Sequence, residues 1–296
     1  MDPRSKWNPL QQQAGTLAAS LPPLLAEAGR LASSVSLGVH GRRKWGVGDS
    51  FWQFRRYTPE DTVSAIDWRQ SAKSQHLFVR QREWEAAQSV WFWRDSSATM
   101  RFKSNFAKVA KADRAAVLAI ALGSLLVRGG ERIAVLGQNR PPSSGRLALH
   151  AIVQELLQVS EHILPPNVPV IRDSQIVWLS DFLFPSEGME AVLRRFADAH
   201  ASGHLVHIID PAEEDFPFEG RTRFESLAGA ETEMFGRAEA VRPAYRERFR
   251  AHAEGVVTLA RRFGWTYLAH RTDKRAEIAL IALYAAVGGE LAEGTT

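Results

Sequence analysis

The sequence predicts an α/β protein with a doubly wound, mainly parallel, Rossmann-like sheet, preceded by a small β-rich N-terminal element. Three observations support this prediction. Short apolar, β-prone runs alternate with longer stretches of helical periodicity from residue 90 to residue 287. The first of these runs is apolar without alternation, as is typical of a strand that is covered on both faces. Residues 38–88 differ in composition, because glycines, arginines and tryptophans surround short strand-like pieces.

The composition of the 296-residue chain is that of an ordinary globular protein. It contains no cysteine, which excludes disulfides and thiolate chemistry and fits a reducing cytoplasm. The net charge of +4 is mild, so we expect no nucleic-acid partner. The N-terminus has no apolar core of the signal-peptide kind, and the longest apolar run, residues 278–287, is too short to span a bilayer. We therefore expect a cytoplasmic protein without a membrane span.

The pattern divides the chain into four parts. Residues 1–37 form a polar tail and one amphipathic helix, and residues 38–88 form the Arg/Trp-rich β element. The α/β domain spans residues 89–287, and residues 288–296 are a tail.

Within the α/β domain, the elements follow from the periodicity and from glycine and proline stops. The predicted strands are residues 90–94, 132–136, 176–179, 205–209 and 265–269, and the predicted helices are residues 104–128, 147–159, 186–201, 243–263 and 277–287. Residues 210–238 are predicted to be a loop that carries a hairpin around Gly229. We expect right-handed crossovers between the parallel strands.

A candidate metal site follows the first strand, where Asp95, Ser97 and Thr99 occupy alternate positions. One carboxylate and two hydroxyls are hard oxygen ligands that suit Mg²⁺ or Mn²⁺, with water and a partner's carboxylate completing the shell. Open α/β sheets bind ligands at this end of their strands. The alternative is that these residues cap the turn before the next helix, as Asp, Ser and Thr commonly do.

Asp181 stands at the corresponding position after the strand of residues 176–179. If this strand neighbours the first one, Asp95 and Asp181 face one crevice, which favours a metal site. The alternative is again that Asp181 caps the following turn.

The β-rich element supplies candidate partner contacts at Arg55, Arg56, Trp68 and Arg69. Arginine and tryptophan are over-represented at interaction hot spots. The alternative is an internal Arg–carboxylate network, because acidic residues are interleaved with these arginines.

Several catalytic and nucleotide-binding signatures are absent from the sequence. It contains no G-x-x-x-x-G-K-[ST], no H-E-x-x-H and no G-x-S-x-G, and no pattern pairs a nucleophile with a general base. We therefore expect no enzymatic activity and no cofactor other than the divalent ion. The alternative is a metal-dependent hydrolase that uses the crevice between Asp95 and Asp181 to activate water.

Several motifs together resemble the domain of unknown function 58 family. The first run is GVGDSFWQFRRY at residues 46–57, followed by TPED at 58–61 and IDWR at 66–69. DSSATM at residues 95–100 stands where the family has Asp-x-Ser-x-Ser-Met, with Thr99 replacing the second serine. SDFL at 180–183, IDPAE at 209–213 and the dipeptide Ala244–Tyr245 also match.

That family is similar to von Willebrand factor type A domains, so the resemblance implies a metal-ion-dependent adhesion site at the upper edge of the sheet. Asp95, Ser97 and Thr99 would be the first ligand motif and Asp181 the last. Such sites usually take a further threonine from an intervening loop, but residues 147–176 contain none, and Ser160 is a weak substitute. The resemblance also implies an adaptor or chaperone-like role beside a MoxR-type AAA+ ATPase that acts on a protein client.

Overall fold

The computed structural model describes residues 25–35, 51–58, 63, 66–74, 76–82, 87–138, 140–157, 162–226 and 232–289. The chain divides into two compact units. The smaller unit is His40–Ala87, and the larger one combines Met1–Val39 with Gln88–Thr296.

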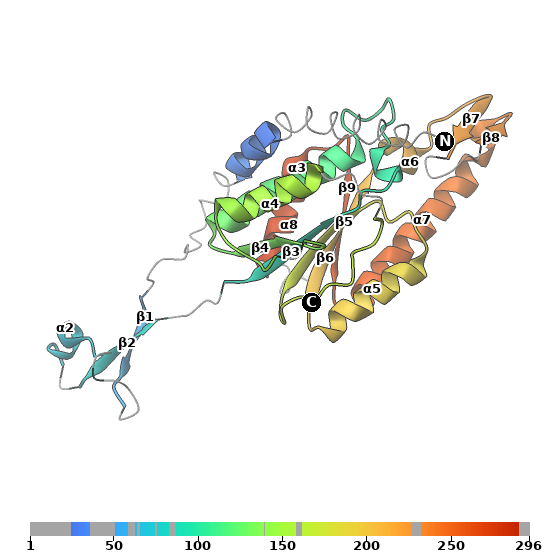
Figure 1. Cartoon of the computed structure of the whole chain (residues 1–296). Helices are drawn as coiled ribbons and strands as arrows, with labels where there is room; N and C mark the ends of the chain where they lie inside the picture. The colour runs from blue at the N-terminus through green and yellow to red at the C-terminus, as the bar shows by residue number, and fades with distance from the viewer. Residues whose placement is uncertain are drawn as a thin grey trace, which may run out of the picture. The chain divides into compact units, whose positions relative to one another are not determined.

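The larger unit is built on a five-stranded sheet, which confirms the predicted α/β fold (Figure 1). Its strands are β3 (Ser89–Arg94), β4 (Arg132–Val135), β5 (Gln175–Ser180), β6 (Ser202–Ile209) and β9 (Thr266–Arg271). All neighbouring strands are parallel, in the order β4-β3-β5-β6-β9. The chain leaves β3 for β4 on one side and returns to β5 on the other. The pair β3–β5 is therefore the topological switch point, where sheets of this kind bind ligands.

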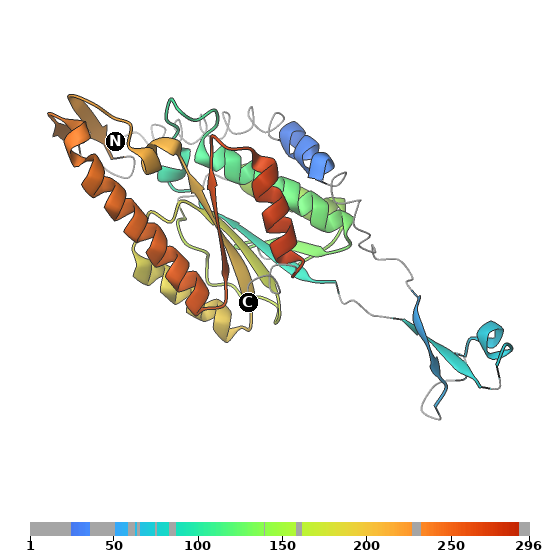
Figure 2. The same ribbon diagram turned by 180° about the vertical axis from the view of Figure 1, so that it is seen from behind.

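Helices cover both faces of the sheet, as the two opposite views show (Figures 1 and 2). One face packs against α3 (Lys111–Arg128), α4 (Arg146–Leu157), α8 (Ala276–Val287) and the helix of residues 25–35. The other face packs against α5 (Ser186–Asp198) and α7 (Ala238–Arg262). None of the helices in the described ranges is long and apolar enough to cross a membrane.

Alternation along each strand assigns its side chains to the two cores. On β3, Val90 and Phe92 face the α3 side, whereas Trp91 and Trp93 face the α5 side. All four side chains are buried, which explains why the run is apolar without alternation.

The predicted start of the first long helix at residue 104 is wrong, because α3 begins at Lys111. The intervening chain holds a short 3₁₀ helix, η3 (Thr99–Arg101), and a loop. Ser104 is held in that loop, since its backbone N–H donates to Asp210 Oδ2 at 2.9 Å and its hydroxyl accepts from the Phe106 N–H at 3.2 Å. These contacts come from a distant segment, so the helical periodicity did not reveal them.

The region of residues 210–238 is only partly the predicted loop. Its hairpin is confirmed as β7 (Thr222–Glu225) and β8 (Thr232–Phe235). It also contains an unpredicted helix, α6 (Pro211–Asp215), which a capping box and a proline in its first turn stabilise.

The start of α7 also differs from the prediction, which began the helix at Pro243. The helix begins at Ala238 and continues through Pro243. Pro243 is the sixth residue of the helix, so it removes one i→i−4 hydrogen bond, but the helix continues past it. The other predicted helices and strands are present, with their ends shifted by a few residues.

The smaller unit contains two antiparallel strands, β1 (Phe51–Arg56) and β2 (Phe78–Arg82), and the short helix α2 (Trp68–Ser71). Asp67 caps α2 by accepting from the Gln70 N–H at 3.0 Å. Next to it, Ile66 bridges to Val79 of β2, and both side chains are buried.

Candidate functional site

The predicted site residues Asp95, Ser97, Thr99 and Asp181 lie at the carboxyl edge of the sheet, after the neighbouring strands β3 and β5. The Asp95 N–H donates to the Leu179 carbonyl at 2.9 Å and so continues the ladder past the end of β3. The Ser180 hydroxyl donates to Asp95 Oδ2 at 2.7 Å. The two segments are thus joined directly at the switch point.

Asp95 is fully buried, and both of its carboxylate oxygens accept a hydrogen bond. Besides the Ser180 hydroxyl, the Ser97 N–H donates to Oδ1 at 2.7 Å. Burial raises the pKa of Asp95, while the bonds from Ser180 and Ser97 oppose that rise. The Ser97 hydroxyl pairs with the Thr99 hydroxyl at 2.9 Å. Contacts of this kind are expected if Asp95, Ser97 and Thr99 cap the turn after β3, which is the alternative to a metal site.

Asp181 forms a buried ion pair with Lys111, the first residue of α3. The Lys111 ammonium lies 2.8 Å from Asp181 Oδ2, and the two side chains are 0% and 2% exposed. Asp181 Oδ1 accepts from the Leu183 N–H at 3.1 Å, so both of its oxygens are also engaged. Phe182, which lies between Asp181 and Leu183 in the chain, has a positive φ of 53°, which is rare for a residue with a side chain of this size.

Glu213 of α6 is the second carboxylate on the Lys111 ammonium. One of its oxygens contacts the ammonium, and the other accepts from the Asp210 N–H at 3.0 Å to complete the capping box. Burial raises the pKa of Glu213, and the Lys111 charge opposes that rise. Lys111 thereby joins α3, the end of β5 and α6.

This arrangement does not fit a divalent ion as it stands. The four oxygens of Asp95 and Asp181 already accept hydrogen bonds, one of them from an ammonium at 2.8 Å. Across the described ranges, no three or more His, Asp or Glu side chains are grouped so that they could hold a metal ion. The binding of Mg²⁺ or Mn²⁺ therefore stays a prediction.

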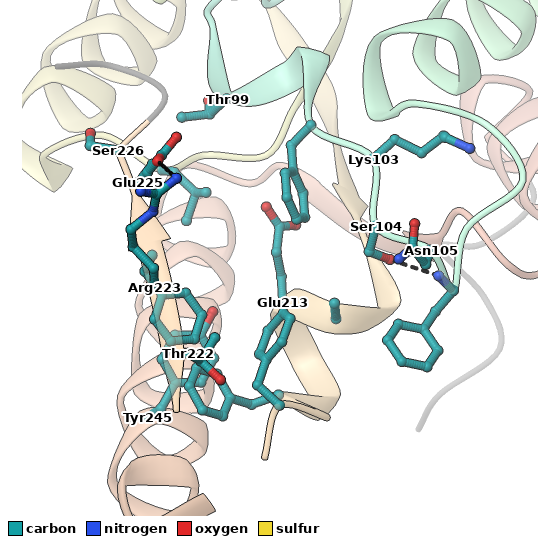
Figure 3. Close-up of a pocket in the computed structure, with 17 residues that line it drawn as sticks. Thr99, Lys103, Ser104, Asn105, Glu213, Thr222, Arg223, Glu225, Ser226 and Tyr245 are labelled. Carbon is teal, nitrogen blue, oxygen red and sulfur yellow. Dashed lines mark hydrogen bonds and ion pairs between the residues drawn. The ribbon is translucent and has the colours of Figure 1, made fainter. Parts of the chain in front are cut away.

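An open pocket of about 510 Å³ adjoins Thr99 and Glu213. We call it the aromatic pocket, because six of its lining residues are Phe102, Phe106, Phe216, Phe218, Phe224 and Tyr245. Figure 3 shows Glu213 between Thr222, Arg223 and Glu225 of β7 on one side and Lys103, Ser104 and Asn105 on the other.

Ring contacts hold one wall of the aromatic pocket together. The Phe216 ring lies 4.5 Å from that of Tyr245 on α7 and 5.4 Å from that of Phe224 on β7, between centroids. Phe216 ends α6 with a positive φ of 43°. Phe106 also lines the pocket and is 58% exposed. The pocket thus combines a packed aromatic wall with an exposed aromatic rim.

Residues 53–255 match the family model described as protein of unknown function DUF58. The chain belongs to the DUF58 family. The matched range runs from β1 to α7, so it includes parts of both units. Three of the motifs in the sequence resemblance, DSSATM, SDFL and IDPAE, lie after β3, across the end of β5 and at the start of α6.

The curated relatives include an uncharacterized protein of Mycobacterium tuberculosis and one of Mycobacterium bovis. Each is 27% identical over 277 residues, which is 87% of this chain and 86% of the relative. Among solved structures, an aerotolerance-related membrane protein from Bacteroides fragilis is 13% identical with a TM-score of 0.42. Conserved hypothetical protein BatB from Bacteroides thetaiotaomicron is 10% identical with a TM-score of 0.39. Each match covers 69% of this chain and 100% of the solved one.

The predicted partner contacts of this DUF58 chain lie in the smaller unit. Trp68 is 61% exposed on α2, where Arg69 is exposed beside it, and Arg56 is exposed on β1. The side chain of Arg55 lies outside the described residues, as do most members of the alternative Arg–carboxylate network. Both interpretations of these arginines stay predictions.

Lys111, Glu213 and the aromatic pocket were not predicted from the sequence as parts of the site. A lysine at the start of a mainly apolar helix was one available signal. The motif Asp210-Pro-Ala-Glu213 was another, because a cap followed three residues later by Glu marks a helix start. Neither signal states which residues the two charged side chains contact.

Proposed function

We propose that this DUF58 protein is a non-enzymatic protein-interaction module with a von Willebrand factor A-like α/β unit. In this proposal it is an adaptor or chaperone-like partner of a MoxR-type AAA+ ATPase and of a protein client. The observation that carries the proposal is the aromatic pocket, which adjoins Thr99 and Glu213 at the carboxyl edge of the sheet.

The composition of the aromatic pocket suits a protein partner. Its rim presents Phe106 and Leu183, which are 58% and 44% exposed. Exposed aromatic and aliphatic side chains around a hollow are typical of anchor sites, into which a partner inserts one or two apolar residues. Arg223 and Glu225 of β7 pair with each other at 2.6 Å and supply a polar margin.

The hydroxyl and carboxylate groups of the site favour interaction over hydrolysis. Ser180 and Asp95 are fully buried and bonded to each other, and Ser97 is bonded to Thr99. Among the residues that the structure describes, no histidine side chain bonds to one of these hydroxyls. The hydrolase alternative needs Asp95 and Asp181 to hold a metal ion that activates water, but the four oxygens of these two residues already accept hydrogen bonds.

Binding to a purified MoxR-type ATPase from the same genome, measured by isothermal titration calorimetry, tests the proposal. Phe106→Ser is the variant of choice, because this exposed ring is at the pocket rim and its removal leaves the core intact. We expect at least a tenfold rise in Kd, the effect of losing one anchor of about 1.4 kcal/mol or more.

Leu147→Ser is the matched control, because Leu147 is 84% exposed on α4 and does not line the aromatic pocket. It should leave the Kd unchanged. Equal affinities of wild type and Phe106→Ser, or turnover of phosphoester substrates that Asp95→Ala abolishes, would contradict the proposal.

A further inference from the structure

The side chain of Lys111 is completely buried at the switch-point edge of the sheet. Bringing an ammonium out of water costs several kcal/mol unless partners compensate it. The partners around it are Asp181 at 2.8 Å, Glu213, and the Phe102 ring, whose centroid is 5.9 Å away. Two carboxylates and a ring face give this ammonium the surroundings of a bound cation.

Lys111 and the two carboxylates that contact it come from three separate parts of the chain. Lys111 begins α3, Asp181 follows β5, and Glu213 belongs to α6. The contacts join residues that are 70 and 102 positions apart in the sequence. The ammonium therefore fixes the relative positions of elements that converge on the aromatic pocket.

Asp181 is the residue that the family resemblance makes the last ligand of a divalent ion. Its Oδ2, however, already has a cation at hydrogen-bond distance. A divalent ion bound at this oxygen would lie next to the ammonium, and the repulsion between two cations in a buried site is large.

We propose that the Lys111 ammonium is the resident cation of this site, in place of a divalent metal, and that it positions Glu213 at the edge of the aromatic pocket. The site is then complete without metal. Lys111 acts as a positioning residue, because its own side chain is not exposed to a partner. This inference does not depend on the identity of the partner.

Thermal denaturation of the full chain in EDTA, in Mg²⁺ and in Mn²⁺ tests this inference. Wild type should melt at the same temperature in all three buffers. Lys111→Met should melt at least about 5 °C lower in EDTA, because Asp181 and Glu213 then face each other without a cation. Millimolar Mg²⁺ or Mn²⁺ should restore part of that loss, since a divalent ion can take the vacated position.

Lys108→Met is the matched control, because Lys108 is exposed three residues earlier. It should melt like wild type in every buffer. The double variant Lys111→Met/Glu213→Gln should regain stability without metal, since it relieves the carboxylate repulsion.

A saturable rise in the wild-type melting temperature with Mg²⁺ or Mn²⁺, lost in Asp181→Asn, would overturn the inference. So would a Lys111→Met variant that melts like wild type. If Lys111→Met does not fold, the melting temperatures of wild type and Asp181→Asn, measured against Mg²⁺ and Mn²⁺ concentration, decide alone. A wild-type melting temperature that does not change with metal supports Lys111 as the resident cation. A saturable rise in the wild-type melting temperature refutes it.

Discussion

At the scale of single residues, Asp95 shows how one buried carboxylate holds two strand ends together. Its oxygens accept from the Ser97 N–H and the Ser180 hydroxyl, both at 2.7 Å. The Ser180 oxygen in turn accepts from the Phe182 N–H at 2.9 Å. This network fixes the turn after β3 to the turn after β5.

The network predicts opposite outcomes for two substitutions of Asp95. Asp95→Ala should lower the free energy of unfolding by about 1–3 kcal/mol, because it leaves two buried donors unpaired. Asp95→Asn keeps an acceptor for Ser97 and removes a buried charge, so its stability should equal or exceed that of wild type. Urea denaturation measures both values, and an Asn variant as unstable as the Ala variant would contradict this account.

Because His207 on β6 is buried, we expect the free energy of unfolding to fall at acid pH. Burial lowers its pKa to about 4; His252 and Lys111 add to the shift, and Asp181 opposes it. Above pH 6.5 the imidazole is neutral in both the folded and the unfolded state, so it does not change the free energy of unfolding. Between pH 6.5 and 4 the unfolded chain binds a proton that the folded chain does not, so the free energy of unfolding falls.

Because burial lowers the pKa of His207 to about 4, the loss that it causes should be on the order of 3 kcal/mol once the pH is below 4. His204 and His270 have pKa values lowered to about 4 by burial and act in the same direction. Urea midpoints measured from pH 7 to pH 4 should decline, and the decline should be shallower in His207→Gln. An identical slope in the variant would refute this assignment.

At this scale the sequence located the strand-end oxygens but not their counter-ion. The positions of Asp95 and Asp181 follow from where two continuous apolar strand runs end, which is a local property. Lys111 reaches Asp181 across 70 residues and Glu213 across 102, and no local pattern encodes such contacts.

At the scale of elements, the pairing of β5 with β6 depends on a close approach at Gly203. A Cβ there would lie 2.5 Å from the Ile176 carbonyl oxygen and 2.6 Å from the Trp265 ring. Both distances are far shorter than a van der Waals contact, and the Ile176 oxygen is a backbone atom that cannot turn away. Only glycine therefore fits this position of β6.

Gly203→Ala should consequently destabilise the protein by about 2 kcal/mol or more, because the strands must separate to admit the methyl group. Gly255→Ala is the matched control, since Gly255 is exposed in α7 and a Cβ added there would have no neighbouring atom within 4 Å. It should stabilise the protein by about 0.5–1 kcal/mol. Chemical denaturation of the two variants compares them, and equal stabilities would contradict the packing described for β6.

Periodicity predicted most of the longer helices well because their burial is regular, as in α5. It failed where tertiary contacts decide the backbone. The bond from Ser104 to Asp210 keeps the residues before Lys111 out of the helix. The short helix α6 depends on its cap, not on an apolar stripe.

At the scale of the whole molecule, the chain offers two candidate contact surfaces, one on each unit. The aromatic pocket belongs to the larger unit, and Trp68 and Arg69 belong to the smaller one. Trp68 is 61% exposed, which favours a contact role over a structural one.

If this surface contacts the proposed MoxR-type ATPase, Trp68→Ala/Arg69→Ala should weaken binding to that ATPase several-fold while leaving the melting temperature unchanged. Calorimetric titration and a thermal melt of the same sample separate the two effects. Lys73→Ala, an exposed position just after α2, serves as control. A lowered melting temperature with unchanged affinity would favour the internal Arg–carboxylate network instead.

In our proposal, the ammonium of Lys111 supplies the cation at the switch point. The most direct test is a calorimetric titration of Mn²⁺ into metal-free wild-type protein, with Asp181→Asn alongside. If Lys111 is the resident cation, neither protein should show saturable binding at millimolar Mn²⁺. A one-site isotherm for wild type that disappears in Asp181→Asn would contradict it and restore the divalent-ion site.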